Sequence, residues 1–508
     1  MVSRPTYRRV GLCLLVVLLL GGIYGAARSS HPTRAAVRPA AVGRSAVSTA
    51  VRVCPAPGSA GPTAASVAVA AVPGTARAGS ASISALAAAG STTAGQVVST
   101  LTQPGVLQLA AVPVAPALTA AELAGQPGSS ASVRTQPGRG GVQVSATGAL
   151  AQGLEVEQTG PGGLVTAQCS APGTSFWFVG AGQASAATIE LYLTNIGSQP
   201  ADAQVQAVTD TSTGAPVLGN ADNGITVPPD GMVVQSLSGL LAGTKIIALN
   251  VTTTVGQVVA AVRESQVGSA DGSWLPVAQA PADQLVIGGL PASGAPQLYI
   301  AVPGTAAADV KITAITQKGS YQPTGGTGIA LLGGSATIIP LPALGDVAGA
   351  VSITSTAPVV AGMLVSGGSA GAPGALAVSG GPVLEQGVLA ANPAGPAGAT
   401  QLVLSAPGKA ATVRISTATA TTPASAQTGQ VVDISAKSSV VVPVAPPAGS
   451  TVTEFTIIVT PLAGSGPVYG GRIISVGGSV QSILPVPSSP TWIPLPHVNQ
   501  SLATILGG

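Results

Sequence analysis

The sequence predicts an all-β protein in which tandem immunoglobulin-like β-sandwich repeats follow an N-terminal transmembrane helix. Three observations predict this. Hydrophobic residues make up 46% of the 508 residues but aromatic residues only 2%, so the core must be assembled from Val, Leu, Ile and Ala, which suits many short strands. A strand-turn-strand pattern recurs four times along the chain. After one early apolar run, no long stretch has the 3.6-residue periodicity of a helix.

The chain begins with an export signal. Residues 1–9 carry Arg4, Arg8 and Arg9 and are expected to form a cytoplasmic tail. Residues 10–27, VGLCLLVVLLLGGIYGAA, are uncharged and follow this basic flank. They are short for spanning about 30 Å of hydrocarbon, and their small residues at the end also fit a cleavage site. We expect a retained single-pass helix in the cell membrane, with the bulk of the chain extracytoplasmic; cleavage and secretion are the alternative.

Charge patterning excludes one class of partner. The first 52 residues hold eight of the 19 basic residues and no acidic residue, and charged residues are only 7% of the chain. A nucleic-acid partner is therefore not expected, because neutralising phosphates needs clustered Lys and Arg. The membrane is the expected partner of the N-terminal helix. Residues 28–50, rich in Arg, Ser, Ala and Pro, are expected to be a flexible spacer.

Four glycines mark the repeats. Gly74, Gly197, Gly304 and Gly408 each lie between two segments that alternate apolar and polar residues. The spacing of about 105 to 120 residues matches one β-sandwich and exceeds a propeller blade or solenoid rung. The predicted repeats are residues 51–164, 165–290, 291–395 and 396–500, followed by a tail at 501–508.

The alternation has period two in each repeat. Ile189, Leu191 and Leu193 are separated by Glu190 and Tyr192. A strand with one apolar and one polar face is a half-buried antiparallel strand. We therefore expect one face of each sheet to be exposed to water.

Two cysteines are expected to form a disulfide. Cys54 and Cys169 are the two cysteines that follow the apolar run. An oxidising compartment favours their pairing, which would restrict the unfolded chain by roughly 4 to 5 kcal/mol. Two unpaired buried thiols are the alternative. Metal binding is not expected, because two thiols without neighbouring ligands cannot complete a tetrahedral shell.

Several segments resemble one family. They are the basic and apolar start, Cys54 in VCPAPG, the stretch CSAPGTSFWFVGAG at 169–182, and the following IELYLTNIGSQPADAQVQAV. Together they resemble an actinobacterial domain-of-unknown-function family of exported, N-terminally membrane-anchored proteins with immunoglobulin-like repeats. The resemblance covers most of the chain. It implies a cell-envelope location and supplies no activity.

Motifs with catalytic or ligand-binding patterns are few. The segment from Gly367 to Gly371 matches the nucleophile pattern G-x-S-x-G around Ser369. That pattern needs a strand-to-helix turn, which is not expected here. The general base would have to be His31 in the spacer or His497 near the C-terminal tail, which are the two histidines of the chain. Glu155 and Glu157 share a strand face, which we expect to be solvated. Asp222-Asn223-Gly224 reads as a turn rather than a calcium loop. No cofactor and no metal are expected.

The aromatic run Phe176-Trp177-Phe178 has two interpretations. Alternation along a strand places Trp177 on the opposite face from the two phenylalanines. The first interpretation is packing in a core or between repeats, and we expect Trp274 and Trp492 to share such a packing role. The second is an exposed platform that binds a sugar or a protein.

Together these observations predict a non-catalytic cell-envelope protein, not an enzyme, that acts as an extracytoplasmic scaffold or binding arm. An envelope protein or a glycan is the expected partner. The alternative is a secreted carbohydrate- or peptidoglycan-associated binding module released after Ala27. The third reading is a serine hydrolase that uses Ser369.

Overall fold

The structure is a computed structural model. It describes residues 18–20, 43–55, 65–72, 79–85, 97–100, 130–135, 141–160, 166–180, 187–210, 224–237, 246–266, 272–294, 296–345, 347–365, 375–395, 398–419, 429–450 and 452–495. The chain divides into two compact units, residues 1–45 with 494–508 and residues 46–493. The all-β prediction is confirmed, because every described element after residue 20 is a strand or a turn.

The first unit contains few described residues. Leu18, Leu19 and Leu20 form a short helical segment, and the N–H of Leu495 donates to the carbonyl of Gly43 at 2.7 Å. Among the described residues, none of the helices has the length and apolarity needed to cross a membrane. The rest of the predicted helix at 10–27, the tails at 1–9 and 501–508, and residues 28–42 of the predicted spacer lie outside the described residues. The end of that spacer is not irregular, because β1 (Arg44–Ala46) and the start of the next strand lie within it.

The second unit contains four groups of strands, which we call modules 1 to 4. Module 1 comprises β2 (Thr49–Cys54), β3 (Ala65–Ala70), β4 (Gly79–Ala85), β5 (Val97–Thr100), β6 (Ser130–Thr135), β7 (Val142–Gly148), β8 (Glu155–Thr159) and β9 (Thr166–Gln168). Module 2 comprises β10 (Ser175–Val179), β11 (Ala187–Asn195), β12 (Ala201–Thr209), β13 (Ile225–Val227), β14 (Gly231–Ser236), β15 (Ile246–Val255), β16 (Val259–Gln266) and β17 (Gly272–Leu275).

Modules 3 and 4 follow the same plan. Module 3 comprises β18 (Ala282–Leu290), β19 (Pro296–Ala301), β20 (Ala308–Thr316), β21 (Gly319–Tyr321), β22 (Ile329–Leu331), β23 (Ala336–Pro340), β24 (Gly349–Val365) and β25 (Ala375–Val378). Module 4 comprises β26 (Gly387–Pro393), β27 (Ala399–Ala406), β28 (Ala411–Ala418), β29 (Gln430–Ile434), β30 (Ser438–Val444), β31 (Glu454–Pro461), β32 (Tyr469–Val476) and β33 (Ser479–Pro485). A separate two-stranded sheet pairs β1 with β34 (Trp492–Pro494).

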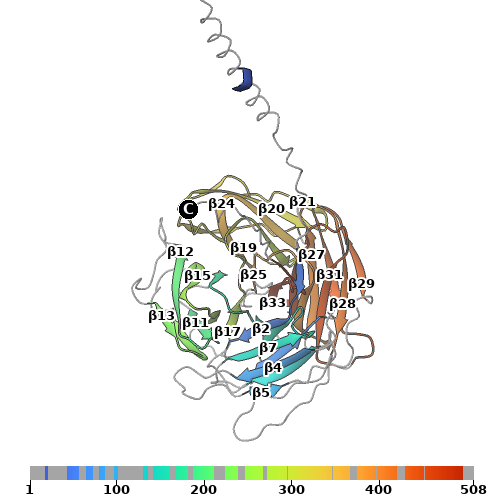
Figure 1. Ribbon diagram of the computed structural model, residues 1–508. Coiled ribbons are helices and arrows are strands. Elements are labelled where there is room, and N and C mark those ends of the chain that lie inside the picture. Colours follow the sequence, from blue (N-terminus) through green and yellow to red (C-terminus); the bar gives the residue numbers. More distant parts are fainter. Residues whose placement is uncertain are drawn as a thin grey trace, which may run out of the picture. The chain divides into compact units, whose positions relative to one another are not determined.

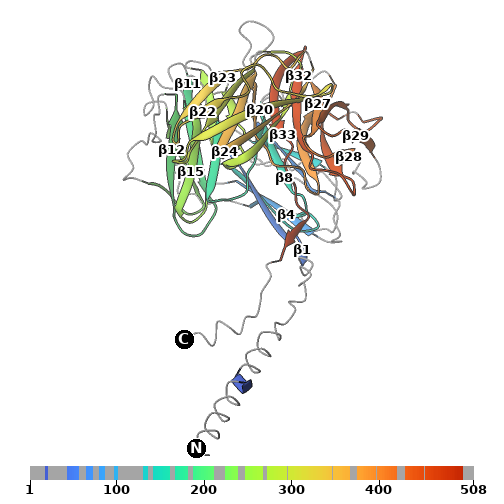
Figure 2. The ribbon, with the colours of Figure 1, turned by 90° about the horizontal axis from the view of Figure 1, so that it is seen from above.

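Modules 1, 2 and 4 each consist of two four-stranded antiparallel sheets with the same strand order. Counting strands within a module, sheet I has the order first, sixth, third, fourth, as in β10-β15-β12-β13. Sheet II has the order fifth, second, seventh, eighth, as in β14-β11-β16-β17. Figure 2 shows the neighbouring strands β12 and β15 side by side. In module 3 one long strand, β24, takes the place of the sixth and seventh strands and joins the two sheets into one. Its first half pairs with β18 and β20, which form sheet I, and its second half pairs with β19 and β25, which form sheet II.

The sheets of a module pack face to face around one core. In module 2, Ile189, Leu191 and Leu193 are fully buried against Phe178 and Leu249 of the opposite sheet. The apolar residues of this alternating strand thus face the core, as expected. The outward face is not simply solvated: Tyr192 is only 4% exposed.

Strand pairing moves the predicted repeat boundaries. Residues 166–168 were expected in the second repeat, but β9 pairs with β8 of module 1. β18 was expected in the second repeat, but it pairs with β24 of module 3. β26 was placed in the third repeat and pairs with β31 of module 4. β18 and β26 are first strands that lie before the glycine landmark of their module, and β9 is a last strand that lies far behind it. In both cases the sequence alone does not reveal the pairing partner.

Consecutive modules contact each other through opposite sheets. Sheet I of module 1 meets sheet II of module 2 through Val53 and Val259, and sheet I of module 2 meets sheet II of module 3 through Trp177 and Tyr299. Sheet I of module 3 meets sheet II of module 4 in the same way. The series does not stop there, because sheet I of module 4 packs on sheet II of module 1. In Figure 1 the orange strands β28 and β31 of module 4 lie near strands of module 1, which are blue to cyan.

Candidate functional site

The contact between modules 4 and 1, which we call the closing interface, holds the most concentrated set of charged side chains among the described residues. Its apolar part is rich in alanine, including Ala68, Ala70, Ala390 and Ala391. Its polar part centres on β8 of module 1. Every residue of β8 is buried.

The structure corrects the expectation that Glu155 and Glu157 face solvent. Glu155 is 3% exposed and Glu157 is 1% exposed. They lie on one face of β8, as the spacing predicts, but module 4 covers that face. A buried carboxylate is tolerated only when it is paired or hydrogen-bonded, and each of the two has found such partners.

Glu157 is held by module 4 alone. Its Oε2 lies 2.7 Å from Nη1 of Arg472, a side chain with 0% exposure. The backbone N–H groups of Ala390 and Ala391 donate to its two carboxylate oxygens at 3.1 and 3.4 Å. The same Nη1 of Arg472 donates to the carbonyl of Ala391 at 2.8 Å and lies 3.3 Å from Oδ1 of Asn392.

A β-bulge explains why these N–H groups are free to bind a carboxylate. The register of β26 against β31 shifts between Leu389 and Asn392, so Ala390 and Ala391 have no ladder partner in β31. A bulge leaves its extra residues unpaired, and Glu157 supplies the acceptor that those amides need. The side chain of Asn392 fixes the bulge by donating to the carbonyls of Leu389 and Phe455, both at 2.8 Å.

Glu155 has a different set of partners. Nη2 of Arg52, on β2, lies 3.2 Å from its Oε1, and Oγ of Ser489 donates to the same oxygen at 3.0 Å. Ser489 in turn accepts from the N–H of Val388 at 3.2 Å. Burial raises the pKa of Glu155 above its ordinary value, and Arg52 and Ser489 act in the opposite direction without cancelling it.

The segment after β33 runs from module 4 onto module 1. Gly153 donates to the carbonyl of Pro490 at 3.1 Å, and Val47 donates to that of Thr491 at 2.9 Å. Both the N–H and the hydroxyl of Thr491 donate to Glu385, at 3.1 and 3.0 Å. Modules 1 and 4 are therefore joined both by the packing of their sheets and by the hydrogen bonds of this segment.

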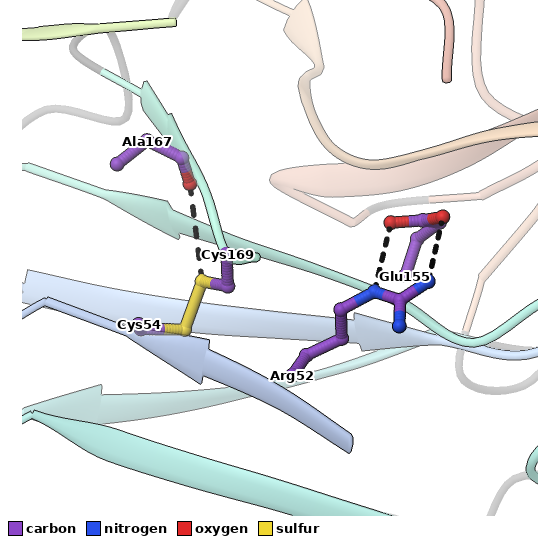
Figure 3. Close-up of a disulfide and its surroundings, with 5 residues drawn as sticks. All are labelled: Arg52, Cys54, Glu155, Ala167 and Cys169. Carbon is purple, nitrogen blue, oxygen red and sulfur yellow. Dashed lines mark hydrogen bonds and ion pairs between the residues drawn. A yellow bond between two sulfur atoms is a disulfide. The ribbon is translucent and has the colours of Figure 1, made fainter. Parts of the chain in front are cut away.

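The predicted disulfide between Cys54 and Cys169 is confirmed. It connects the last residue of β2 to the residue that follows β9, so it joins the first and the last strand of module 1. Figure 3 shows it beside the pair formed by Arg52 and Glu155. The line from Cys169 to Ala167 there marks a 3.9 Å approach of Sγ to a carbonyl oxygen; since the oxidised sulfur carries no proton, this is a contact and not a hydrogen bond.

The aromatic run lies on β10 and is buried. Phe176 and Phe178 are 7% and 0% exposed and belong to the core of module 2. Trp177 points the other way, is 8% exposed, and packs with Tyr299 of module 3. This is the packing of the core-or-interface interpretation. The exposed platform is not what the structure has, because module 3 covers the face on which Trp177 lies.

Trp274 and Trp492 do not share one role. Trp274 makes an edge-on contact with Tyr192, with ring centroids 5.1 Å apart. Trp492 lies on β34 and is 36% exposed. Of these two tryptophans, only Trp274 packs against another aromatic ring among the described residues.

The other sequence candidates fall outside the described residues. They are Ser369 with its glycines, His31, His497, Asp222 and Asn223. Within the described ranges, no group of three His, Cys, Asp or Glu side chains is arranged to hold a metal ion. A cavity of about 10 Å³ lies beside Trp274, Ala167 and Leu484, which is room for about one water molecule.

Sequence reasoning missed Arg472, Ser489 and Asn392. Arg472 had a detectable signal: it is a single charge among the small and apolar residues of the segment GGRII. If this segment is buried, its charge needs a buried partner of opposite sign, whereas Glu157 was expected to face solvent. Ser489 and Asn392 carry no comparable signal, because Ser and Asn are common in turns.

The arrangement is suited to joining modules rather than to turning over a substrate. Each carboxylate faces a guanidinium and further donors, and neither is more than 3% exposed. General acid-base catalysis requires the group to reach the proton it transfers in a bound substrate. The carboxylate oxygens of Glu155 and Glu157 are instead bound to groups of the protein itself.

A family comparison covers much of this architecture. The family described as "Family of unknown function (DUF5719)" matches residues 122–445. The chain belongs to this family. The DUF5719 range runs from β6 to the start of the segment after β30, so it includes Glu155, Glu157 and Cys169, whereas Cys54 and Arg472 lie on either side of it. No curated protein matches the chain.

Proposed function

We propose that this chain is a non-catalytic cell-envelope protein: an extracytoplasmic scaffold or binding arm, anchored in the cell membrane by one N-terminal helix at residues 10–27. The closing interface is the observation that carries the proposal. The charged side chains in this interface form ion pairs and hydrogen bonds that hold module 1 to module 4. They are Arg52, Glu155, Glu157 and Arg472.

The disulfide supports an extracytoplasmic location. Disulfides such as that of Cys54 with Cys169 form and persist in oxidising compartments and are rare in the cytosol. The basic and apolar start of the chain has the composition of an export signal. Both features favour transfer of the modules across the membrane, and the actinobacterial envelope is the location we propose.

The four modules are proposed to be β-sandwich repeats of immunoglobulin-like architecture. They share with immunoglobulin domains the face-to-face packing of two antiparallel sheets and pairings between strands distant in sequence. Modules 1, 2 and 4 have four strands in each sheet, as in double-Greek-key sandwiches, whereas an immunoglobulin constant-type domain has four and three. The partner of such a scaffold is proposed to be an envelope protein or a glycan.

Fractionation of cells that export the chain tests the proposal. The expected result is recovery in the membrane fraction, with a peptide that begins at Met1 or Val2 detected by mass spectrometry and with modules accessible to protease added outside the cell. Recovery only in the medium, with a new N-terminus at Arg28, would defeat the anchored form and favour the secreted binding module. Cross-linking in intact cells then identifies the partner.

A further inference from the structure

The disulfide is connected by short contacts to the closing interface. The N–H of Cys169 donates to the carbonyl of Val156 at 2.9 Å, and Val156 is the residue between Glu155 and Glu157. On the other side, Cys54 is two residues from Arg52, on the same face of β2. The disulfide thus joins the backbone that carries the two carboxylates to the strand that carries one of their cations.

β2 lies at the edge of module 1, where its Val53 also packs on Val259 of module 2. It is an edge strand, whose ladder partner within sheet I is β7. Two further hydrogen bonds, from Val53 to Ser170 at 2.8 Å and from Ser170 to Val53 at 3.2 Å, lie directly beside the disulfide. An edge strand is held by a ladder on one side only, so it opens locally more readily than a central strand. The cross-link therefore adds a covalent restraint to the contacts that keep Arg52 within reach of Glu155.

We propose that the Cys54–Cys169 disulfide is a redox-dependent lock for the closing interface, so that modules 1 and 4 close firmly only after the chain is oxidised. This goes beyond the proposed scaffold role and does not depend on the identity of a partner. It gives the cross-link a consequence at Glu157 and Arg472, which lie on other strands and do not touch either sulfur.

The redox step is a thiol-disulfide exchange with an extracytoplasmic disulfide as oxidant. The thiolate of one cysteine attacks a sulfur of that oxidant, and a mixed disulfide forms while one thiol leaves. The thiolate of the second cysteine then attacks the mixed disulfide, the Cys54–Cys169 bond forms, and the second thiol leaves. Two cysteine thiols are oxidised, one disulfide of the oxidant is reduced, and the two protons end on the departing thiols.

Linkage makes the effect reciprocal. If the disulfide stabilises the closed interface, closure must equally stabilise the disulfide. The exposed fractions of Cys54 and Cys169 are 0% and 1%, so a reducing thiol reaches them only when the region opens. A variant that weakens the closing interface without touching the cysteines should therefore make the disulfide easier to reduce.

Amide hydrogen exchange on the full chain tests the forward direction. The variant is Cys54→Ser/Cys169→Ser, and the reporters are the N–H groups of Ala390 and Ala391, which donate to Glu157. We expect both to exchange about tenfold faster than in the wild type or more. The control reporter is the N–H of Ala278, which donates to the carbonyl of Trp177 at 2.8 Å and does not lie in the closing interface. Its exchange rate is expected to stay the same. Unchanged exchange at Ala390 and Ala391 in a folded variant would overturn the proposal.

Two matched serine variants test the reverse direction with the disulfide intact. Ser489→Ala removes a donor to Glu155 in the closing interface. Ser439→Ala removes a buried hydroxyl that donates to Ile315 at 2.8 Å between modules 3 and 4. With dithiothreitol as reductant, we expect the disulfide of Ser489→Ala to be reduced about tenfold faster than that of the wild type, and that of Ser439→Ala at the wild-type rate. Equal rates for both variants and the wild type contradict the lock.

Discussion

Glu155 and Glu157 lie two residues apart on one strand and meet different electrostatic surroundings. Glu157 is bound by a fully buried guanidinium and by two backbone amides. Glu155 faces Arg52, whose side chain is 17% exposed, and a solvated cation stabilises a buried carboxylate less than a buried one does. The desolvation of Glu155 is therefore incompletely offset, which is why its pKa is raised.

This raised pKa predicts a pH dependence of stability. When the pKa of a carboxyl is higher in the folded than in the unfolded state, the folded state binds more protons between the two values, so stability falls as pH rises through that window. The window for Glu155 begins near its ordinary value of 4.5. We expect the free energy of unfolding of the wild type to fall, relative to Glu155→Gln, as pH rises from about 4.5 through the raised pKa.

Urea denaturation at a series of pH values measures this difference. Asp283→Asn, at an exposed carboxylate, serves as the control and is expected to follow the wild type. A wild type that gains stability relative to Glu155→Gln over the same window would show that the sign is wrong.

At this scale the sequence was informative about the cysteines and the aromatic run, and misleading about the glutamates. Cys54 and Cys169 were the two cysteines beyond the apolar run, so pairing had one solution. Alternation placed Trp177 opposite its two neighbours, because that depends only on strand geometry. The burial of Glu155 and Glu157 depends on a module that lies more than 200 residues later, and no local pattern contains that information.

At the scale of strands, glycine allows close approach between modules 3 and 4. β18 and β32 meet where Gly288 and Gly289 face Gly470 and Gly471. A Cβ added at Gly471 would lie 2.7 Å from the carbonyl carbon of Gly288 and closer still to Gly289. Two sheets can pack at this short distance only if neither carries a side chain at the contact.

Gly471→Ala is therefore expected to destabilise the protein by about 1 to 3 kcal/mol, the usual cost of overpacking. Gly408→Ala is the matched control, because an added Cβ there meets nothing within 4 Å; its effect should stay within about 1 kcal/mol. Thermal unfolding of both variants measures the difference. Equal melting temperatures would mean that the sheets can move apart without loss.

Strand type was easier to predict than strand partnership. Period-two alternation identified strands such as β11, β20 and β28. It did not reveal that β24 continues from one sheet into the other, because the alternation within a strand does not show which strands it pairs with. Nor did it assign β18 and β26 to the modules that follow them, since pairing is a non-local property.

For the second unit, contacts from module 1 to 2, 2 to 3, 3 to 4 and 4 to 1 form a closed series. Every module then has a neighbour on both of its sheets. This explains the low content of charged residues, because many outward faces, such as those of β8 and β10, are covered by another module. The expectation of one solvated face per sheet fails for the same reason. Sequence repetition indicated the number of modules but carried no sign of the last contact.

The closing contact can be tested through the ion pair that spans 315 residues of sequence. Glu157→Gln leaves the guanidinium of Arg472 buried without a counter-charge, which typically costs about 3 to 5 kcal/mol. In Glu157→Gln/Arg472→Met the buried cation is gone, while the amide oxygen of Gln at 157 still accepts from the bulge at Ala390. We expect this double variant to recover more than half of the lost stability in urea denaturation. A single variant within about 1 kcal/mol of the wild type, or a double variant less stable than the single one, would show that modules 1 and 4 do not depend on this pair.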